Sequence, residues 1–364
     1  MGEKIYQIAL TLIPGIGDVL ARNLVSYCGS VEAVFKQKKS QLTHIPGIGE
    51  KLANEITRFS NFNQAEAELK FIQKHQIQTH FYLDKTYPKR LKQIGDAPIL
   101  LYSLGNVNLD AERIVAIVGT RKASEYGKSI TEKIVETLVP TDALILSGLA
   151  LGIDVAAHRH ALKQGLNTVG VVAHGLDRIY PSQHKNLAKQ MLENGGLLTE
   201  FPSGTIPDRE NFPKRNRIVA GLCDVLIVVE TGIKGGAMIT AEIANSYNKE
   251  IMSVPGRIND DNSFGNNVLI KLNKASILTM PEDVLQLMGW EGNSKTKVVQ
   301  QAIPFNLEPI EQEIVDIVKS KTKVGIDDIA YTLQMDSGNL SLTLLDMEFK
   351  GIIKQLPGKF YQLA

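Results

Sequence analysis

Glycine-rich loops, several of them with a basic side chain, follow five short apolar runs in this chain of 364 residues. Because glycine has no side chain, the backbone amides of such a loop can approach a phosphate closely and point at it. One glycine loop would be weak evidence, since glycine is also a common turn residue. Five together favour a phosphate-binding surface, and its candidate residues are Gly119, Thr120, Arg121, Ser147, Gly148, Lys234, Gly235, Gly236 and Arg257.

The densest basic stretch is 208–217, which holds four cations and two acids. Phe212 within it could stack on a base, and neighbouring asparagines could hydrogen-bond to bases or sugars. Cations interleaved with an aromatic residue suit single-stranded nucleic acid better than a small coenzyme. A solvated helix start is the alternative, but the apolar residues that follow would fix the stretch at a pocket rim. The candidate contacts here are Asn211, Arg215, Asn216 and Arg217.

Motifs for cofactors, metals and covalent catalysis are missing from the sequence. It has neither a complete Gly-x-Gly-x-x-Gly fingerprint nor a Gly-x-x-x-x-Gly-Lys-Ser/Thr loop. The histidines form no metal spacing, and His158 and His160 are expected to be solvated or at the edge of the core. Cys28 and Cys223 are far apart and predict neither a disulfide framework nor a metal site. Ser147 lacks a local His or Asp partner, so its hydroxyl is expected to donate to phosphate. We predict no cofactor and no metal.

The apolar runs that precede the glycine loops predict strands. They are apolar along nearly their whole length, which indicates strands buried on both faces of a parallel sheet. Helical stretches alternate with them, as in a doubly wound α/β domain. Ligands of such sheets bind beyond the carboxyl ends of the strands, which is where the glycine loops fall. The expected strands are 114–118, 143–146, 168–172, 225–229 and 251–254, and the helices are 124–139, 152–164, 183–194, 214–222 and 237–247.

A repeat marks the N-terminal part: Ile-Pro-Gly-Ile-Gly at 13–17 returns at 45–49, and helix-forming sequence follows each copy. This resembles the helix-hairpin-helix module of SAM-like domains, which holds nucleic-acid backbones at the amides of a helix N-terminus. Residues 1–75 hold nine Lys and Arg against seven Asp and Glu, so the attraction for a polyanion is weak. A purely structural role for this helical domain is favoured, and contact with nucleic acid stays open.

The C-terminal part resembles a winged helix. Helices are expected at 309–319, 326–333 and 337–350, and short strands at 352–356 and 360–363. Residues 296–364 hold seven basic and nine acidic side chains, so this domain would repel DNA. A protein-contact or regulatory role is therefore favoured over DNA binding.

The composition limits the class of protein. Hydrophobic residues make up 43% and charged residues 22%, which is ordinary for a chain that buries cores. The net charge of +1 means that a nucleic-acid site must be a local patch. No apolar run is long enough to span a membrane, and the start lacks a signal-peptide pattern. We expect a cytoplasmic protein without membrane contact, organised as 1–75, 79–290, a linker at 291–306, and 307–364.

Several stretches together resemble the DprA/Smf family of DNA-processing proteins. The resemblance implies an extended Rossmann-like core that forms a homodimer and binds single-stranded DNA without sequence preference. It also implies help in loading the RecA recombinase during natural transformation. The DNA contacts that it implies are Arg121, the Ser147-Gly148 turn, Asn211, Arg215, Arg217 and the Gly235-Gly236 turn. The matching stretches are 119–127, 147–154 with 156–158, 175–181, 211–218, 235–242 and 254–256.

One alternative is an enzyme. Gly235-Gly236-x-x-x-Thr240-x-Glu242 resembles a loop of nucleoside-phosphate hydrolases of the lysine-decarboxylase-like Rossmann family, in which Glu242 would help to cleave a glycosidic bond. Met238 and Ile239 stand where that loop has Gly-Thr, and a small nucleotide would not explain the flanking domains. We expect no enzyme, and we expect Glu242 to be a structural residue in an early turn of its helix, where the helix dipole favours a carboxylate.

Overall fold

The computed structural model describes residues 2–291, 307–321, 324–356 and 359–363. The chain divides into two compact units, residues 1–292 and 293–364, and each is described here by itself. Of the expected linker at 291–306, all but Glu291 lies outside the described residues. No described helix has the length and apolar character that crossing a membrane requires.

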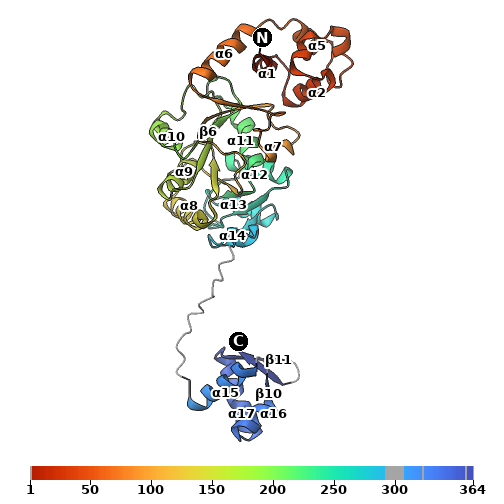
Figure 1. Cartoon of the computed structure of the whole chain (residues 1–364). Coiled ribbons are helices and arrows are strands. Elements are labelled where there is room, and N and C mark those ends of the chain that lie inside the picture. The colour runs from red at the N-terminus through yellow and green to blue at the C-terminus, as the bar shows by residue number, and fades with distance from the viewer. Residues whose placement is uncertain (1, 292–306, 322–323, 357–358, 364) are drawn as a thin grey trace. The chain divides into compact units, whose positions relative to one another are not determined.

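A nine-stranded sheet forms the centre of the first unit, in the order β1-β2-β6-β5-β4-β3-β7-β8-β9 (Figure 1). In this order, the strands from β6 through β9 are parallel to one another, whereas β2 pairs antiparallel with both β1 and β6 at one edge of the sheet. The expected mostly parallel, doubly wound sheet is confirmed. Its strands are β1 Gln78–Phe81, β2 Leu100–Gly105, β3 Ile114–Val118, β4 Leu144–Ser147, β5 Thr168–Val171, β6 Gly195–Thr199, β7 Val225–Val228, β8 Glu250–Ser253 and β9 Ser276–Ile277.

Helices cover both faces of the sheet, which is why its central strands are apolar throughout. Successive side chains of a strand point to opposite faces. Val115 and Ile117 of β3 belong to the core formed with α8 and α9. Ala116 and Val118 belong to the core formed with α11 and α12. The helices of this region are α7 Lys89–Lys92, α8 Glu125–Leu138, α9 Ile153–Lys163, α10 Lys185–Met191, α11 Asn211–Leu222, α12 Gly236–Ser246, α13 Phe264–Lys271 and α14 Asp283–Met288.

The two copies of the N-terminal repeat pack against each other. Gly15 and Gly47 have φ values of +77° and +85°, which favour glycine. A Cβ on Gly15 would lie 2.9 Å from a methyl of Leu52, and one on Gly47 would lie 2.7 Å from a methyl of Leu20. Each turn therefore receives a leucine from the other copy. The helices are α1 Glu3–Thr11, α2 Asp18–Cys28, α3 Val31–Lys36, α4 Lys39–Leu42, α5 Glu50–Thr57 and α6 Phe62–Lys74.

These helices share a hydrophobic core with the antiparallel edge of the sheet. Leu24 of α2 and Ile72 of α6 lie in one buried cluster with Phe81 of β1 and Tyr102 of β2. Both regions therefore belong to the first compact unit, although the sequence pattern changes between them.

The second unit has the expected winged-helix fold. Its three helices precede a hairpin, and a short strand that the sequence pattern did not predict, β10, pairs with β12. The buried cluster of this unit includes Leu340, Leu344 and Met347 from one face of α17. Its elements are α15 Pro309–Lys321, β10 Val324–Gly325, α16 Ile326–Leu333, α17 Ser337–Phe349, β11 Ile353–Leu356 and β12 Phe360–Leu363.

Candidate nucleic-acid interface

A pocket of about 380 Å³ opens beyond the carboxyl ends of the central strands. The strand order reverses there, because β3 is paired with β4 on one side and with β7 on the other. The loops that leave such neighbours diverge and form a crevice. The pocket therefore brings together the expected loop residues Gly119, Thr120, Arg121, Gly148, Gly235 and Gly236, and α11 adds Phe212, Arg215 and Asn216.

Arg121 forms a cation–aromatic stack at the pocket mouth. Its guanidinium carbon lies 5.2 Å from the centroid of the Phe212 ring. The ring of Tyr180 lies 6.4 Å from that of Phe212, and the Tyr180 side chain is 48% exposed. The aromatic rings can hold the guanidinium in place while its N–H groups remain available to an anion.

Arg215 lies deeper in the pocket and is only 7% exposed. It donates to the Val171 carbonyl and to Asn216 Oδ1, the latter at 3.0 Å. Gly148 passes close by: a Cβ there would lie 2.2 Å from Arg215 Nη1 and 2.4 Å from Asp154 Oδ2. Burial raises the pKa of Asp154 above its usual value, although the charge of Arg215 opposes this rise. The backbone at Gly148 can approach both charged groups only because it lacks a side chain.

Two buried histidines hold the loop after β4 from its inner side. His158 Nε2 lies 2.5 Å from the Gly148 carbonyl, and His184 Nδ1 lies 2.9 Å from the Leu149 carbonyl. Burial lowers the pKa of His158 to about 4, so this imidazole is neutral at neutral pH. Its Nε2–H then donates to Gly148, while Nδ1 lies 2.7 Å from the Thr168 hydroxyl, which itself donates to the Ile145 carbonyl at 2.9 Å. His158 is therefore a positioning residue. The signal for it was its place four positions after Asp154, on the same helix face.

Glu230 is a second supporting residue that the sequence interpretation missed. It lies two residues after the end of β7, is 2% exposed, and accepts a 3.0 Å hydrogen bond from the Ser124 amide as well as a bond from the Ser124 hydroxyl. That hydroxyl in turn accepts from the Gly127 amide at 3.0 Å and caps α8. Glu230 thus ties the start of α8 to the β7 loop. The sequence signal for this role was a carboxylate directly after the fully apolar strand expected at 225–229.

Two residues that were expected to contact DNA have side chains that point away from the pocket. Ser147 is fully buried, and its hydroxyl donates to the Ile117 carbonyl at 2.5 Å, so it is not a phosphate donor in this conformation. Arg217 lies in a separate groove, where Asp18 and Glu200 surround it. The reason is helix geometry, because side chains two positions apart on a helix point in very different directions.

The remaining expected contacts lie beside the pocket. Asn211 begins α11 and its side chain is partly exposed. Lys234 is exposed on the loop between two pocket-lining glycines. Arg257 lines a different hollow, which it shares with Tyr126. All three stay predictions.

Glu242 lies in the second turn of α12, and its carboxylate pairs with Lys274 at 2.8 Å. The expected early-turn position is therefore corrected: the residue stands seventh in a helix that begins at Gly236. It is not among the residues that line the pocket. Among the described residues, no group of His, Cys, Asp or Glu is arranged to hold a metal ion.

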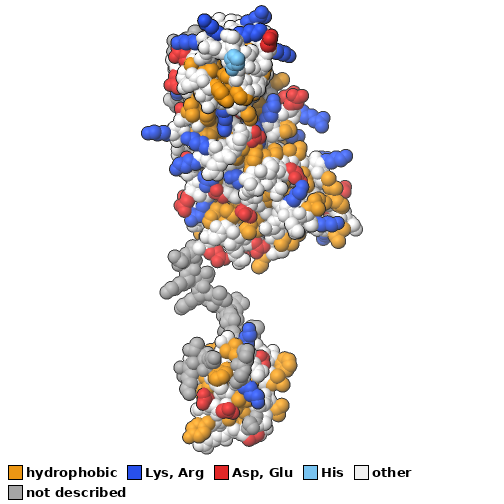
Figure 2. Space-filling view, turned by 90° about the vertical axis from the view of Figure 1, so that its right-hand side faces the viewer, with side chains coloured by type: hydrophobic (Ala, Val, Ile, Leu, Met, Phe, Trp, Pro, Cys, Tyr) orange, Lys and Arg blue, Asp and Glu red, His pale blue; other side chains and the backbone are white. Residues whose placement is uncertain are grey.

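On the face drawn in Figure 2, the charged side chains form small patches. Figure 2 shows Lys and Arg side chains on this face of the first unit interspersed with acidic and hydrophobic ones, without one continuous basic surface. This agrees with the nearly balanced composition of 40 basic and 39 acidic residues. The net charge of +1 therefore offers little long-range attraction to a polyanion.

Comparison with family models assigns all three regions of the chain. Residues 78–289 match DNA recombination-mediator protein A. Residues 8–59 match a SAM-like helix-hairpin-helix tandem, and residues 300–359 match the DprA winged helix domain.

Two curated proteins are similar in sequence. The Smf protein of Synechocystis sp. is 31% identical, over 99% of this chain and 98% of that protein. The DNA processing protein DprA of Streptococcus pneumoniae is 40% identical, over 56% of this chain and 71% of that protein.

Two solved structures are similar in fold. DprA from Streptococcus pneumoniae has a TM-score of 0.68 at 31% identity and covers 79% of this chain and 98% of its own. DprA from Helicobacter pylori, described for its single-stranded DNA binding mode, has a TM-score of 0.54 at 30% identity and covers 59% of this chain and 96% of its own. The resemblance seen in the sequence motifs is thereby confirmed. The chain belongs to the DprA/Smf family of DNA recombination-mediator proteins.

Proposed function

We propose that this chain binds single-stranded DNA at the pocket between β3 and β7. The observation that carries the proposal is the convergence of three glycine loops with Arg121, Phe212 and Arg215 at the reversal of strand order. Backbone amides and guanidinium groups bind phosphate, and an aromatic ring beside them can stack on an unpaired base. The Helicobacter pylori relative, which is described as binding single-stranded DNA, supports this ligand.

The binding is expected to be blind to sequence and to prefer single strands. The pocket offers phosphate ligands and a ring face, and every base has a face that can stack. A duplex hides these faces inside its stack, so it could use only the cations. Because the net charge is only +1, those cations would hold a duplex weakly.

The process served is recombination, by the description of the family model that matches most of the chain. We further propose that the chain acts as a homodimer in the cytoplasm, loads RecA onto the bound strand and serves natural transformation. Family membership supports these steps.

A salt titration of oligo-dT binding tests the DNA function. For single strands the log–log slope is about −0.7 per phosphate neutralised, so three to five contacts give about −2 to −3.5. A duplex of the same length should bind more weakly at every salt concentration. A slope near zero, or tighter binding of the duplex, would refute the proposal.

We also propose that the chain is not an enzyme. Glu242 is engaged by Lys274 outside the pocket, whereas catalysis would need a carboxylate within about 3 Å of a substrate sugar. Incubation with nucleoside monophosphates should therefore release no ribose phosphate. Release by the parent protein but not by Glu242→Gln would establish the hydrolase instead.

A further inference from the structure

A buried asparagine is bonded to the backbone of the proposed DNA pocket without lining it. Asn266 is the third residue of α13, it is fully buried, and it is not among the residues that line the pocket. A polar side chain in such a place needs hydrogen-bond partners, because it has given up its bonds to water. Its side-chain amide makes three hydrogen bonds, each to the backbone at the end of β7.

These bonds hold the segment in which β7 passes into its glycine loop. Asn266 Nδ2 donates to the carbonyls of Val228 and Val229 at 2.9 and 3.1 Å. Its Oδ1 accepts from the Thr231 amide at 2.7 Å. Pairing of β7 with β8 ends at Val228. The asparagine therefore supplies a donor and an acceptor, as a neighbouring strand would, just where the strand pairing stops.

The glycine that precedes Asn266 binds the same loop from its other side. The Gly265 amide donates to the Thr231 carbonyl at 2.8 Å, so the start of α13 binds both backbone groups of this threonine. A Cβ on Gly265 would lie 2.7 Å from that carbonyl oxygen, so only glycine allows the approach. Thr231 itself lines the pocket together with Gly232 and Gly235.

The end of β7 also holds the loop that carries Arg121. The Glu230 carbonyl accepts from the Thr120 amide at 2.7 Å, and the Glu230 carboxylate accepts from Ser124. A shift of the end of β7 would therefore displace the glycine loops on both sides of the pocket.

We propose that Asn266 is a positioning residue for DNA binding, which holds the end of β7 and its glycine loop in the binding conformation before DNA arrives. The choice of ligand rests on the proposed function, whereas the anchoring of the loop does not. A preset loop spares the strand the entropy cost of ordering it. Ordering the backbone of even one loop residue on binding would weaken the affinity by about 5- to 30-fold.

The first test needs no DNA and measures hydrogen exchange of the Thr231 amide. In the parent, the bond to Asn266 should protect this amide. Asn266→Leu fills a similar volume but offers no acceptor, so the protection at Thr231 should be lost. The amide of Ile117, in the centre of the sheet, should stay protected in both proteins. Equal protection of Thr231 in the parent and in the variant would overturn the anchoring.

The second test measures oligo-dT affinity and melting temperature together. Asn266→Leu should bind oligo-dT about 5- to 30-fold more weakly than the parent. Val34→Ala is the matched control, because it removes buried methyl groups from the core of the N-terminal helices, away from the pocket. It should lower the melting temperature and keep the parent's affinity. If both variants lose affinity in proportion to their melting temperatures, the role of Asn266 is one of general stability and the proposal fails.

Asn266→Asp separates the hydrogen bonds from the packing. As a neutral acid this side chain can accept from the Thr231 amide and donate to one carbonyl, whereas as a carboxylate it faces the carbonyls of Val228 and Val229 without a donor. Burial favours the neutral acid. The affinity of the variant relative to the parent should therefore recover as the pH falls from 8 to 5, and the ratio removes the contribution of groups that titrate in both proteins. A ratio that does not change with pH would refute the role of the hydrogen bonds.

A second variant covers the case in which Asn266→Leu does not fold. Gly265→Ala would press a methyl group against the Thr231 carbonyl, and it should lower the affinity for oligo-dT in the same way. Parent-like affinity of a folded Gly265→Ala protein would then count against the proposal. If the parent binds no oligo-dT while Thr231 loses its protection in Asn266→Leu, the DNA function fails and the anchoring of the loop stands.

Discussion

Arg121 is the side chain on which the proposed function depends most directly. It is exposed, it lines the pocket, and its described ring contact with Phe212 leaves its N–H groups available. A hydrogen bond from a charged group to phosphate contributes about 1.5–3 kcal/mol, which corresponds to about 10- to 150-fold in affinity. Arg121→Ala should therefore weaken binding to all sequences alike by this factor, with an unchanged melting temperature.

The matched control for this variant is Arg159→Ala, at an exposed arginine of α9 that lines neither the pocket nor the groove of Arg217. It removes the same charge and should keep the parent's affinity. If both variants lose affinity equally, the effect is one of overall charge rather than of the pocket.

His158 should act through the hydrogen bond that it donates. His158→Gln can place an amide donor near the Gly148 carbonyl and should retain most of the affinity for oligo-dT. His158→Leu fills a similar volume but leaves that buried carbonyl unpaired, at a cost of about 1–3 kcal/mol of stability. It should lower both the melting temperature and the affinity. If His158→Gln loses as much affinity as His158→Leu, the volume of the ring matters and the hydrogen bond does not.

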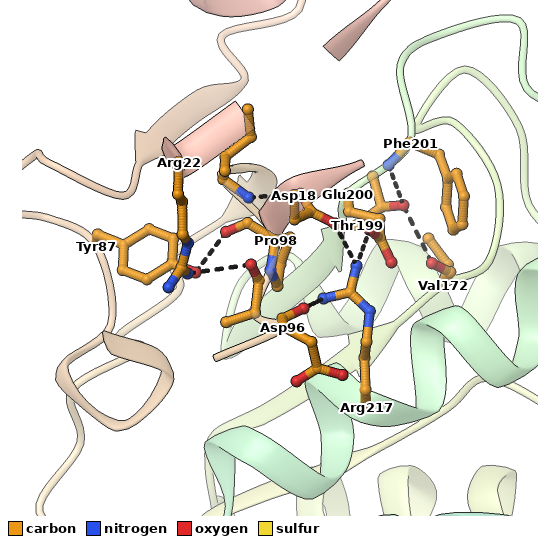
Figure 3. Close-up of polar contacts among 12 residues, drawn as sticks. Asp18, Arg22, Tyr87, Asp96, Pro98, Val172, Thr199, Glu200, Phe201 and Arg217 are labelled. Atoms are coloured by element: carbon orange, nitrogen blue, oxygen red, sulfur yellow. Dashed lines mark hydrogen bonds and ion pairs between the residues drawn. The ribbon is translucent and has the colours of Figure 1, made fainter. Parts of the chain in front are cut away.

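The types of residue at the site could be predicted from the sequence better than the directions in which their side chains point. Arg121 and Arg215 line the same pocket, as expected, because Arg121 follows a predicted strand and Arg215 precedes the apolar part of a predicted helix. The prediction that the Ser147 hydroxyl donates to phosphate was wrong, because the side chain of the last residue of a strand can turn into the core. Arg217 was misplaced because it stands two positions after Arg215 in α11, so its side chain points in a very different direction, toward Asp18 and Glu200 (Figure 3).

At the scale of elements, the periodic patterns were reliable. The strand expected at 114–118 is β3 Ile114–Val118, and the helix expected at 326–333 is α16 Ile326–Leu333. The strand β6 was not predicted from the sequence, because it begins with Gly195-Gly196 and two adjacent glycines are typical of a turn. Both glycines have positive φ, and a Cβ on Gly195 would lie 2.0 Å from the Thr168 carbonyl oxygen. These glycines allow neighbouring strands to approach closely, a role that only the paired sheet makes visible.

Gly148 allows a comparable close approach in the loop after β4, and it gives a prediction for that loop. Gly148→Ala would put a methyl group into contact with Arg215 and Asp154, so one of these buried groups must move. Overpacking of this kind costs about 1–3 kcal/mol. Thermal unfolding should show that loss, and oligo-dT binding should weaken because Arg215 is displaced.

Gly95→Ala is the control for this variant, because a Cβ at Gly95 would meet nothing within 4 Å. Its melting temperature and its affinity should match those of the parent. A Gly148→Ala protein with the parent's melting temperature and affinity would show that the loop does not require the close approach.

At the scale of the whole molecule, the two units differ in what they can offer to DNA. The first contains the pocket and its cations. In the second, α17 would be the helix that reads DNA in a winged helix that binds it. Its outward side chains include Leu342 at 68% and Phe349 at 83% exposure. Lys350, at its end, is paired with Glu311 at 2.7 Å and with Asp346 at 2.6 Å. This surface is suited to contact with protein rather than with phosphate.

Removal of residues 297–364 should therefore leave oligo-dT affinity within a few-fold of that of the full chain. The first compact unit ends at residue 292, so the deletion leaves it whole. Because the deleted segment holds more acidic than basic side chains, its loss removes a weak repulsion and should not reduce the slope of the salt titration. Affinity and slope are measured together, with circular dichroism to establish that the truncated chain is folded. A folded truncation that binds ten times more weakly has lost about 1.4 kcal/mol, and its winged helix would then contact DNA despite its charge.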